Sequence, residues 1–166
     1  MLFRSWQRIK AGAILLADRA YSDYTTLAVL TSRGVDVVTR LHQGRAPDCR
    51  LGKRLGTGEC LRVFTKPVQQ PRSLGKRLWQ RLAPEVTVRL ITLRVNRKGF
   101  RPGVITLMTT LLDTKKYPRS MIEELYLRRW KLELCLRDIK TTMGMEALRA
   151  KTPAMIEKEI YGYLVA

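Results

Sequence analysis

A strand, a helix and a second strand follow one another near the start of the sequence, and this order constrains the fold more than any other feature. Residues 13–17 form a short apolar run, which is typical of a buried strand. Ser22 or Asp23 is in place to cap a helix that stops at Gly34. The alternating segment 35–41 follows as the second strand. Because a strand–helix–strand connection favours parallel pairing, we expect an α/β fold.

Three later segments alternate between apolar and polar residues and predict an antiparallel sheet. They are Cys60–Lys66, Val86–Val95 and Val104–Leu111, and prolines or glycines separate them. Residues 72–82 predict a turn or a short helix. Residues 42–58 are rich in glycine, arginine, lysine and proline, and they predict an exposed basic loop that contacts phosphate.

Two helical patterns complete the chain. The longer one opens at Pro118, since proline suits the first turn of a helix, and continues to about Met143 before Gly144. A final helix begins near Pro153 and is still apolar and periodic at Ala166. We therefore expect a chain that is cut short at its C-terminus.

The charge balance is the first indication of a partner. The 166 residues include 32 Lys and Arg against 14 Asp and Glu, for a formal net charge of +18. Such an excess favours a polyanion, above all nucleic acid, with an anionic membrane surface or a ribosome as the alternatives. No apolar run approaches the roughly 20 residues of a membrane span, and the first residues lack the pattern of a signal peptide. We expect a cytoplasmic protein with no membrane partner.

The three cysteines are odd in number and far apart, and none lies in a Cys-x-x-Cys motif. They are Cys49, Cys60 and Cys135. This arrangement predicts neither a disulfide nor a zinc site.

Four residues of the longer helix share one face. Tyr126, Arg129, Glu133 and Lys140 lie at offsets of 0, 3, 7 and 14, which places them within an arc of about 60°. Arg137 extends this face. By spacing alone, the alternative is a solvated charged face in which Glu133 and Arg137 form an ordinary i,i+4 pair.

The order Tyr-x2-Arg-x3-Glu-x6-Lys is the signature of DDE transposases of the insertion sequence 4 family, and the match is complete here. A second match is the segment Ala17–Tyr21, which resembles the family segment that carries the second catalytic aspartate at the end of a strand. The resemblance covers nearly the whole chain.

The resemblance implies a ribonuclease-H-like α/β core, formed by residues 1–41 and 117–166, with a mainly β insertion at about 42–116. It implies cut-and-paste DNA transposition of a bacterial insertion sequence by two-metal phosphoryl transfer. Asp18 and Glu133 would be catalytic carboxylates that together hold Mg²⁺, with Mn²⁺ as an alternative. Double-stranded DNA, as element ends and as target, would be the partner.

Further residues are candidates for DNA contacts. The resemblance implies that Arg129 and Lys140 neutralise phosphates beside the scissile bond, and Arg137 lies on the same face. Tyr126 would contact the backbone through its hydroxyl group, or else pack in the core.

Trp79 and His42 are candidates outside that helix. By the resemblance to this family, Trp79 would stack on a flipped or unpaired base, with core packing as the alternative. His42 borders the basic loop and would contact phosphate. Asp18 itself has an alternative as the cap of a turn.

None of the 17 residues before Asp18 is acidic, whereas the family's first catalytic aspartate precedes this segment. We therefore expect a segment truncated at its N-terminus and inactive as a nuclease on its own. The alternative is a non-catalytic DNA-binding remnant, or an inhibitor that dimerises with itself or with full-length transposase. An RNA- or ribosome-binding protein is a third possibility.

Overall fold

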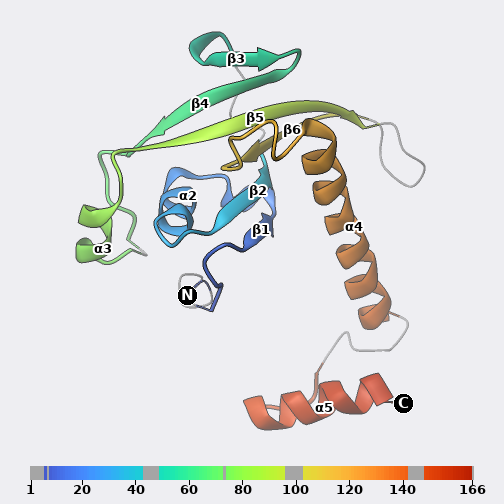
Figure 1. Ribbon diagram of the computed structural model, residues 1–166. Helices are drawn as coiled ribbons and strands as arrows, with labels where there is room; N and C mark the ends of the chain where they lie inside the picture. Colours follow the sequence, from blue (N-terminus) through green and yellow to red (C-terminus); the bar gives the residue numbers. More distant parts are fainter. Residues whose placement is uncertain are drawn as a thin grey trace. The chain divides into compact units, whose positions relative to one another are not determined.

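Six strands form one sheet in the computed structural model of the chain (Figure 1). The structure describes residue 6 and residues 8–42, 49–72, 74–95, 103–141 and 148–165. The strand order is β1-β2-β6-β5-β4-β3. The bounds are Ile14–Ala17 (β1), Asp36–Arg40 (β2), Lys53–Gly56 (β3), Glu59–Thr65 (β4), Glu85–Val95 (β5) and Gly103–Thr109 (β6).

The pairing of the strands confirms the prediction of a mixed α/β fold. β1 and β2 are parallel, with Leu16 opposite Val38, and every other neighbouring pair is antiparallel. β4 pairs over its whole length with residues 85–91 of β5, and β5 pairs with β6 from Arg89 to Val95 (Figure 1). The parallel pair and the antiparallel strands therefore belong to one sheet, joined where β2 meets β6.

The helix between the two parallel strands is α2, Tyr24–Thr31. Asp23 caps it, because its Oδ1 accepts a hydrogen bond from the backbone N–H of Thr26 at 3.0 Å. Gly34 has a φ of +70°, a conformation that glycine adopts at little cost and that lets the chain turn into β2. Both ends of the helix therefore lie where the sequence predicts them.

The prediction of an exposed basic loop at 42–58 is wrong for residues 53–56. Residues 53–56 are β3, which pairs with β4 in an antiparallel hairpin. Residues 43–48 of the predicted loop lie outside the described residues. A strand rich in Lys, Arg and Gly lacks an apolar alternation, so its pairing depends on β4 and not on its own composition.

The expectation that the cysteines form no disulfide is also wrong. Cys49 and Cys60 are joined by a disulfide, with their Cα atoms 5.6 Å apart, and Cys135 is free and exposed. A 3-10 helix at Cys49–Leu51 precedes β3, and the hairpin returns the chain so that this helix lies against β4. The hairpin thus brings together two cysteines that are 11 residues apart in the sequence.

The sheet carries an apolar cluster on each face. The first cluster includes residues from α2 and from α3, Lys76–Arg81, together with Val37, Val88 and Met108 of the strands. The second includes Val38, Ile91, Leu93 and Leu107, together with Ile122 and Tyr126 from the beginning of α4. Neighbouring strand residues alternate between the clusters, as the period of two requires.

The two C-terminal helices are α4, Arg119–Thr141, and α5, Pro153–Val165. Both were predicted, and the predicted end of the first at Met143 lies outside the described residues. The chain divides into two compact units, Met1–Tyr126 and Leu127–Ala166. In the second unit, Glu159 of α5 accepts hydrogen bonds from the backbone N–H groups of Arg149 and Ala150. None of the described helices is long and apolar enough to cross a membrane.

Candidate active site and nucleic-acid interface

Asp18 lies directly after the last residue of β1, and its carboxylate is exposed. Its Oδ1 accepts a hydrogen bond from the N–H of Arg19 at 2.6 Å, at the start of a short 3-10 helix. Its carbonyl oxygen accepts a hydrogen bond from Thr39 Oγ1 of β2 at 2.7 Å. Asp18 therefore caps a turn, as its alternative role predicts, and its backbone is also held at the sheet edge.

His42 lies at the same edge of the sheet. β1 and β2 are parallel, and Ala17 is opposite Thr39, so the residues that follow both strands emerge together. His42 follows β2 by two residues and is exposed. The structure thus brings these two candidates to the carboxyl end of the parallel strands, where ligands bind in open α/β sheets.

All five candidates in the long helix lie on α4, as predicted from their spacing. They are Tyr126, Arg129, Glu133, Arg137 and Lys140. Tyr126 is 6% exposed and belongs to the apolar cluster with Ile91, Leu93 and Ile122. Its burial agrees with the packed alternative for this side chain.

The charged candidates of α4 belong to the second unit, whereas Asp18 belongs to the first. Arg129 is partly buried. The side chain of Arg137 is 65% exposed, and its Nη2 lies 3.5 Å from Asp138 Oδ1. The side chains of Glu133 and Lys140 lie outside the described part of the structure.

Trp79 lies in the core and not at the surface. It is 9% exposed, and its ring packs edge-on against Tyr24 with the centroids 6.1 Å apart. The Nζ of Lys66 lies 4.6 Å from the centre of the indole. These contacts and the low exposure of the side chain agree with the packing alternative.

A buried ion pair that was not predicted from the sequence contacts the segment directly before α4. Arg89 donates from Nε to Glu59 Oε1 at 2.5 Å and from Nη1 to the carbonyl oxygen of Tyr117 at 2.6 Å. The signal was present in the pattern of β5, because Arg89 shares its inward side with Ile91 and Leu93. A charged residue at such a position requires a buried partner.

Arg119 ties the first residue of α4 to the sheet. Its guanidinium group donates to the carbonyl oxygens of Thr57 at 2.7 Å and Thr92 at 2.5 Å. Just before the helix, the carboxylate of Asp113 accepts hydrogen bonds from the N–H groups of Lys116 and Lys115, and these lower its pKa. The beginning of the helix that carries Glu133 is therefore held by several specific contacts.

The described residues include one of the two proposed carboxylate ligands, Asp18, whereas the side chain of Glu133 lies outside them. No three His, Cys, Asp or Glu side chains of the described part gather closely enough to hold a metal ion. Asp18 supplies one exposed carboxylate, which is the ligand type that Mg²⁺ and Mn²⁺ prefer.

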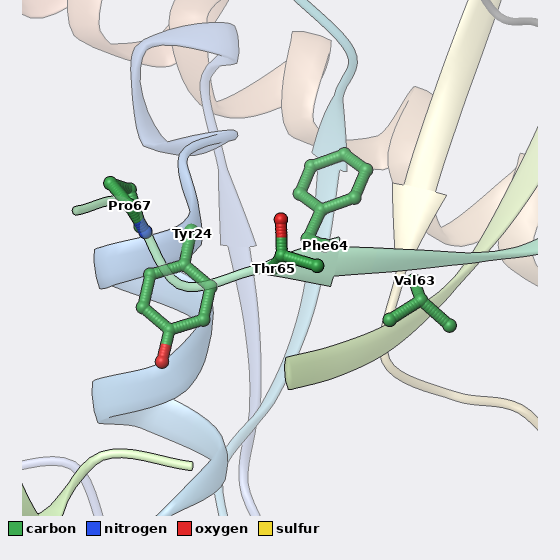
Figure 2. A pocket seen from close by; sticks show the side chains of 5 residues that line it. All are labelled: Tyr24, Val63, Phe64, Thr65 and Pro67. Atoms are coloured by element: carbon green, nitrogen blue, oxygen red, sulfur yellow. The ribbon is translucent and has the colours of Figure 1, made fainter. Parts of the chain in front are cut away.

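A pocket of about 290 Å³ lies away from Asp18, beside the end of β4. Figure 2 shows the residues that line it, which are Val63, Phe64 and Thr65 of β4, Pro67 and Tyr24 of α2. The Tyr24 hydroxyl donates to the carbonyl oxygen of Ala83, and burial raises the pKa of this tyrosine. The pocket contains no carboxylate, so it does not resemble a metal site.

Comparison with known proteins gives a consistent result. A family model described as the transposase DDE domain matches residues 2–166. The chain is 39% identical over 117 residues to the transposase InsG for insertion sequence element IS4 of Escherichia coli, covering 69% of this chain and 24% of the relative. It is 32% identical over 60 residues to the transposase for insertion sequence element IS421 of Escherichia coli, covering 36% of this chain and 16% of the relative. The chain thus spans about a quarter or less of these relatives.

Proposed function

This chain belongs to the DDE transposases of the insertion-sequence-4 type, and from that premise we propose that it supplies two carboxylates of a DNA-processing active site. The observation that carries the proposal is the position of Asp18. Its carboxylate is exposed at the carboxyl end of β1, and hydrogen bonds from Arg19 and Thr39 restrain the residue. Glu133 is the second carboxylate, within the Tyr-Arg-Glu-Lys motif of α4.

Asp18 and Glu133 would hold Mg²⁺, or Mn²⁺, through their carboxylate oxygens. A bound pair of such ions would supply activation of water or of a DNA 3′-hydroxyl group and stabilisation of the leaving oxygen. Asp18 follows a strand and Glu133 lies in a long helix. Such rigid elements would keep each carboxylate in a fixed position for metal binding.

The basic residues of the same helix face have a separate role in the proposal. Arg129, Arg137 and Lys140 would bind phosphates that flank the bond to be cleaved, and His42 would contact phosphate at the sheet edge. Tyr126, which is buried, would mainly anchor the helix to the apolar cluster.

The family implies a ribonuclease-H-like fold, and the six-stranded mixed sheet is consistent with it. We propose that residues 1–41 and 117–166 correspond to the core and residues 42–116 to the β-rich insertion. These 166 residues include no acidic side chain before Asp18. On their own, they would bind double-stranded DNA without cutting it, because two carboxylates hold two cations poorly.

Paramagnetic Mn²⁺ offers a direct test in the 166-residue protein. We expect it to broaden the amide NMR signals around Asp18 and Glu133, and to do so much less in Asp18→Asn and Glu133→Gln variants. Glu157→Gln is the matched control, because it makes the same chemical change at an exposed site on α5. Equal broadening in all four proteins, or broadening elsewhere only, would refute the metal site.

Cleavage of a labelled DNA duplex with Mg²⁺ or Mn²⁺ tests the expected lack of activity. Salt-sensitive binding without nicking is the expected result. Nicking that Glu133→Gln abolishes and Glu157→Gln preserves would show that a complete active site assembles from these residues, and would contradict the proposed inactivity.

A further inference from the structure

The short helix α3 is held by its buried residue Trp79 and by two buried leucines that flank the helix. Trp79, Leu74 and Leu82 are each at most 9% exposed and belong to the apolar cluster on the α2 side of the sheet. The Nζ of Lys66 donates to the carbonyl oxygens of Trp79 at 2.5 Å and Leu82 at 3.3 Å, at the end of the helix. The side-chain amide of Gln70 donates to the carbonyl oxygen of Leu74 at 2.6 Å. The backbone of this segment is therefore fixed although the helix has only six residues.

The outer face of α3 carries only positive charge. Lys76, Arg77 and Arg81 are exposed, and so is Arg72 in the preceding loop. We call these four residues the α3 basic surface. On the helix, the three charged positions fall within an arc of about 140°, and the middle of this arc lies about 130° from Trp79.

The residues that precede these charges do not balance them, and the first acidic residue after Arg81 is Glu85. The stretch from residue 61 to residue 84 contains no Asp or Glu. Within the described part of the chain, no ion pair joins the four side chains to a carboxylate. Arg77 and Arg81 are also like charges at i,i+4, and Lys76 and Arg77 lie at the positive end of the helix dipole, so both arrangements oppose helix formation.

A polyanion would remove this unfavourable electrostatic energy. We propose that the α3 basic surface binds phosphates of the duplex DNA backbone, independently of base sequence. A six-residue helix is about 9 Å long, and duplex DNA carries about five charges over that length, so enough phosphates are available for the three charged side chains of the helix. This inference rests on the proposed function in DNA processing, and it assigns a second contact surface apart from Asp18 and Glu133.

The test is the salt dependence of duplex binding by the whole 166-residue protein. The triple variant Lys76→Gln, Arg77→Gln, Arg81→Gln should reduce the slope of log affinity against log salt by about 2.7, at about 0.9 per phosphate contact. Affinity at about 0.1 M salt should fall at least tenfold. The matched control is Arg149→Gln, Lys151→Gln, Lys158→Gln, which removes three exposed positive charges from the second unit.

Equal losses of affinity in the two triple variants would overturn the inference, because only net charge would then matter. A conservative variant, Arg77→Lys with Arg81→Lys, keeps the charges and should keep the slope. Circular dichroism would establish that each variant is folded, and single substitutions, each lowering the slope by about 0.9, provide a test should the triple variant unfold.

Failure of this inference differs from failure of the proposed function. An unmodified protein that binds duplex DNA, together with a triple variant that binds equally well, would refute only the α3 surface. An unmodified protein that does not bind duplex DNA would refute both. A triple variant that loses affinity for a structured RNA but keeps its affinity for duplex DNA would assign the surface to RNA and also overturn the inference.

Discussion

Arg89 and Glu59 form an ion pair between neighbouring strands, with Nε and Oε1 2.5 Å apart and side chains only 1% and 12% exposed. The same guanidinium group donates to the carbonyl oxygen of Tyr117, directly before α4. The pair thus connects β4, β5 and the segment that leads into the helix of Glu133. The charge of Arg89 is compensated where water does not reach it.

The first prediction concerns this ion pair. Glu59→Ala would leave the buried Arg89 without its carboxylate and should lower the free energy of unfolding by about 3–5 kcal/mol. Asp138→Ala is the control, because it removes the partner of the exposed Arg137 and should cost no more than about 1 kcal/mol. Urea unfolding followed by circular dichroism measures both. Equal losses of unfolding free energy in the two variants would contradict the prediction that the buried ion pair stabilises the protein more than the exposed one.

The second prediction separates packing from base stacking at Trp79. Trp79→Ala should destabilise the protein by about 3–5 kcal/mol, since it removes a large side chain from the core. Trp79→Phe keeps an aromatic ring in the core and should leave duplex affinity within about twofold. A folded Trp79→Phe variant with normal stability and a large loss of DNA binding would support stacking instead.

The third prediction is a pH dependence at Asp113. Hydrogen bonds from the N–H groups of Lys116 and Lys115 lower the pKa of this carboxyl group below its usual 3.8, so the folded state favours the ionised form. Its contribution to stability is therefore present above the usual pKa and is lost as the pH falls through the lowered value. The difference in unfolding free energy between the unmodified protein and Asp113→Asn should narrow as the pH falls below 3.8 and through the lowered pKa. A difference in unfolding free energy between the two proteins that stays constant with pH would contradict the prediction.

The fourth prediction concerns the disulfide between Cys49 and Cys60. Peptide mapping without reduction should recover these two cysteines cross-linked, whereas the exposed Cys135 reacts with an alkylating reagent. Because the bond closes a loop across an 11-residue separation, reduction should lower the free energy of unfolding by about 3 kcal/mol. Alkylation of all three cysteines in the folded, unreduced protein is the contrary outcome.

Much of the local structure follows from short-range patterns. The helix cap at Ser22 or Asp23, the helix stop at Gly34 and the period of two in β5 and β6 each depend on neighbouring residues. The structure confirms all three and shows that Asp23 is the cap. The helix that carries the Tyr-Arg-Glu-Lys motif was predicted for the same reason, because its spacing is a property of one segment. The roles of the motif residues stay predictions that the Mn²⁺ and cleavage experiments test.

Tertiary structure alone decided which distant residues meet. The sequence by itself determined the kind of each main element and the face on which its polar residues lie, because these depend on contacts within a few residues. It did not determine that β3 pairs with β4, that Cys49 bonds to Cys60, or that Arg89 finds Glu59. Those contacts depend on strand register across the sheet, where a shift of one residue would turn each side chain to the opposite face.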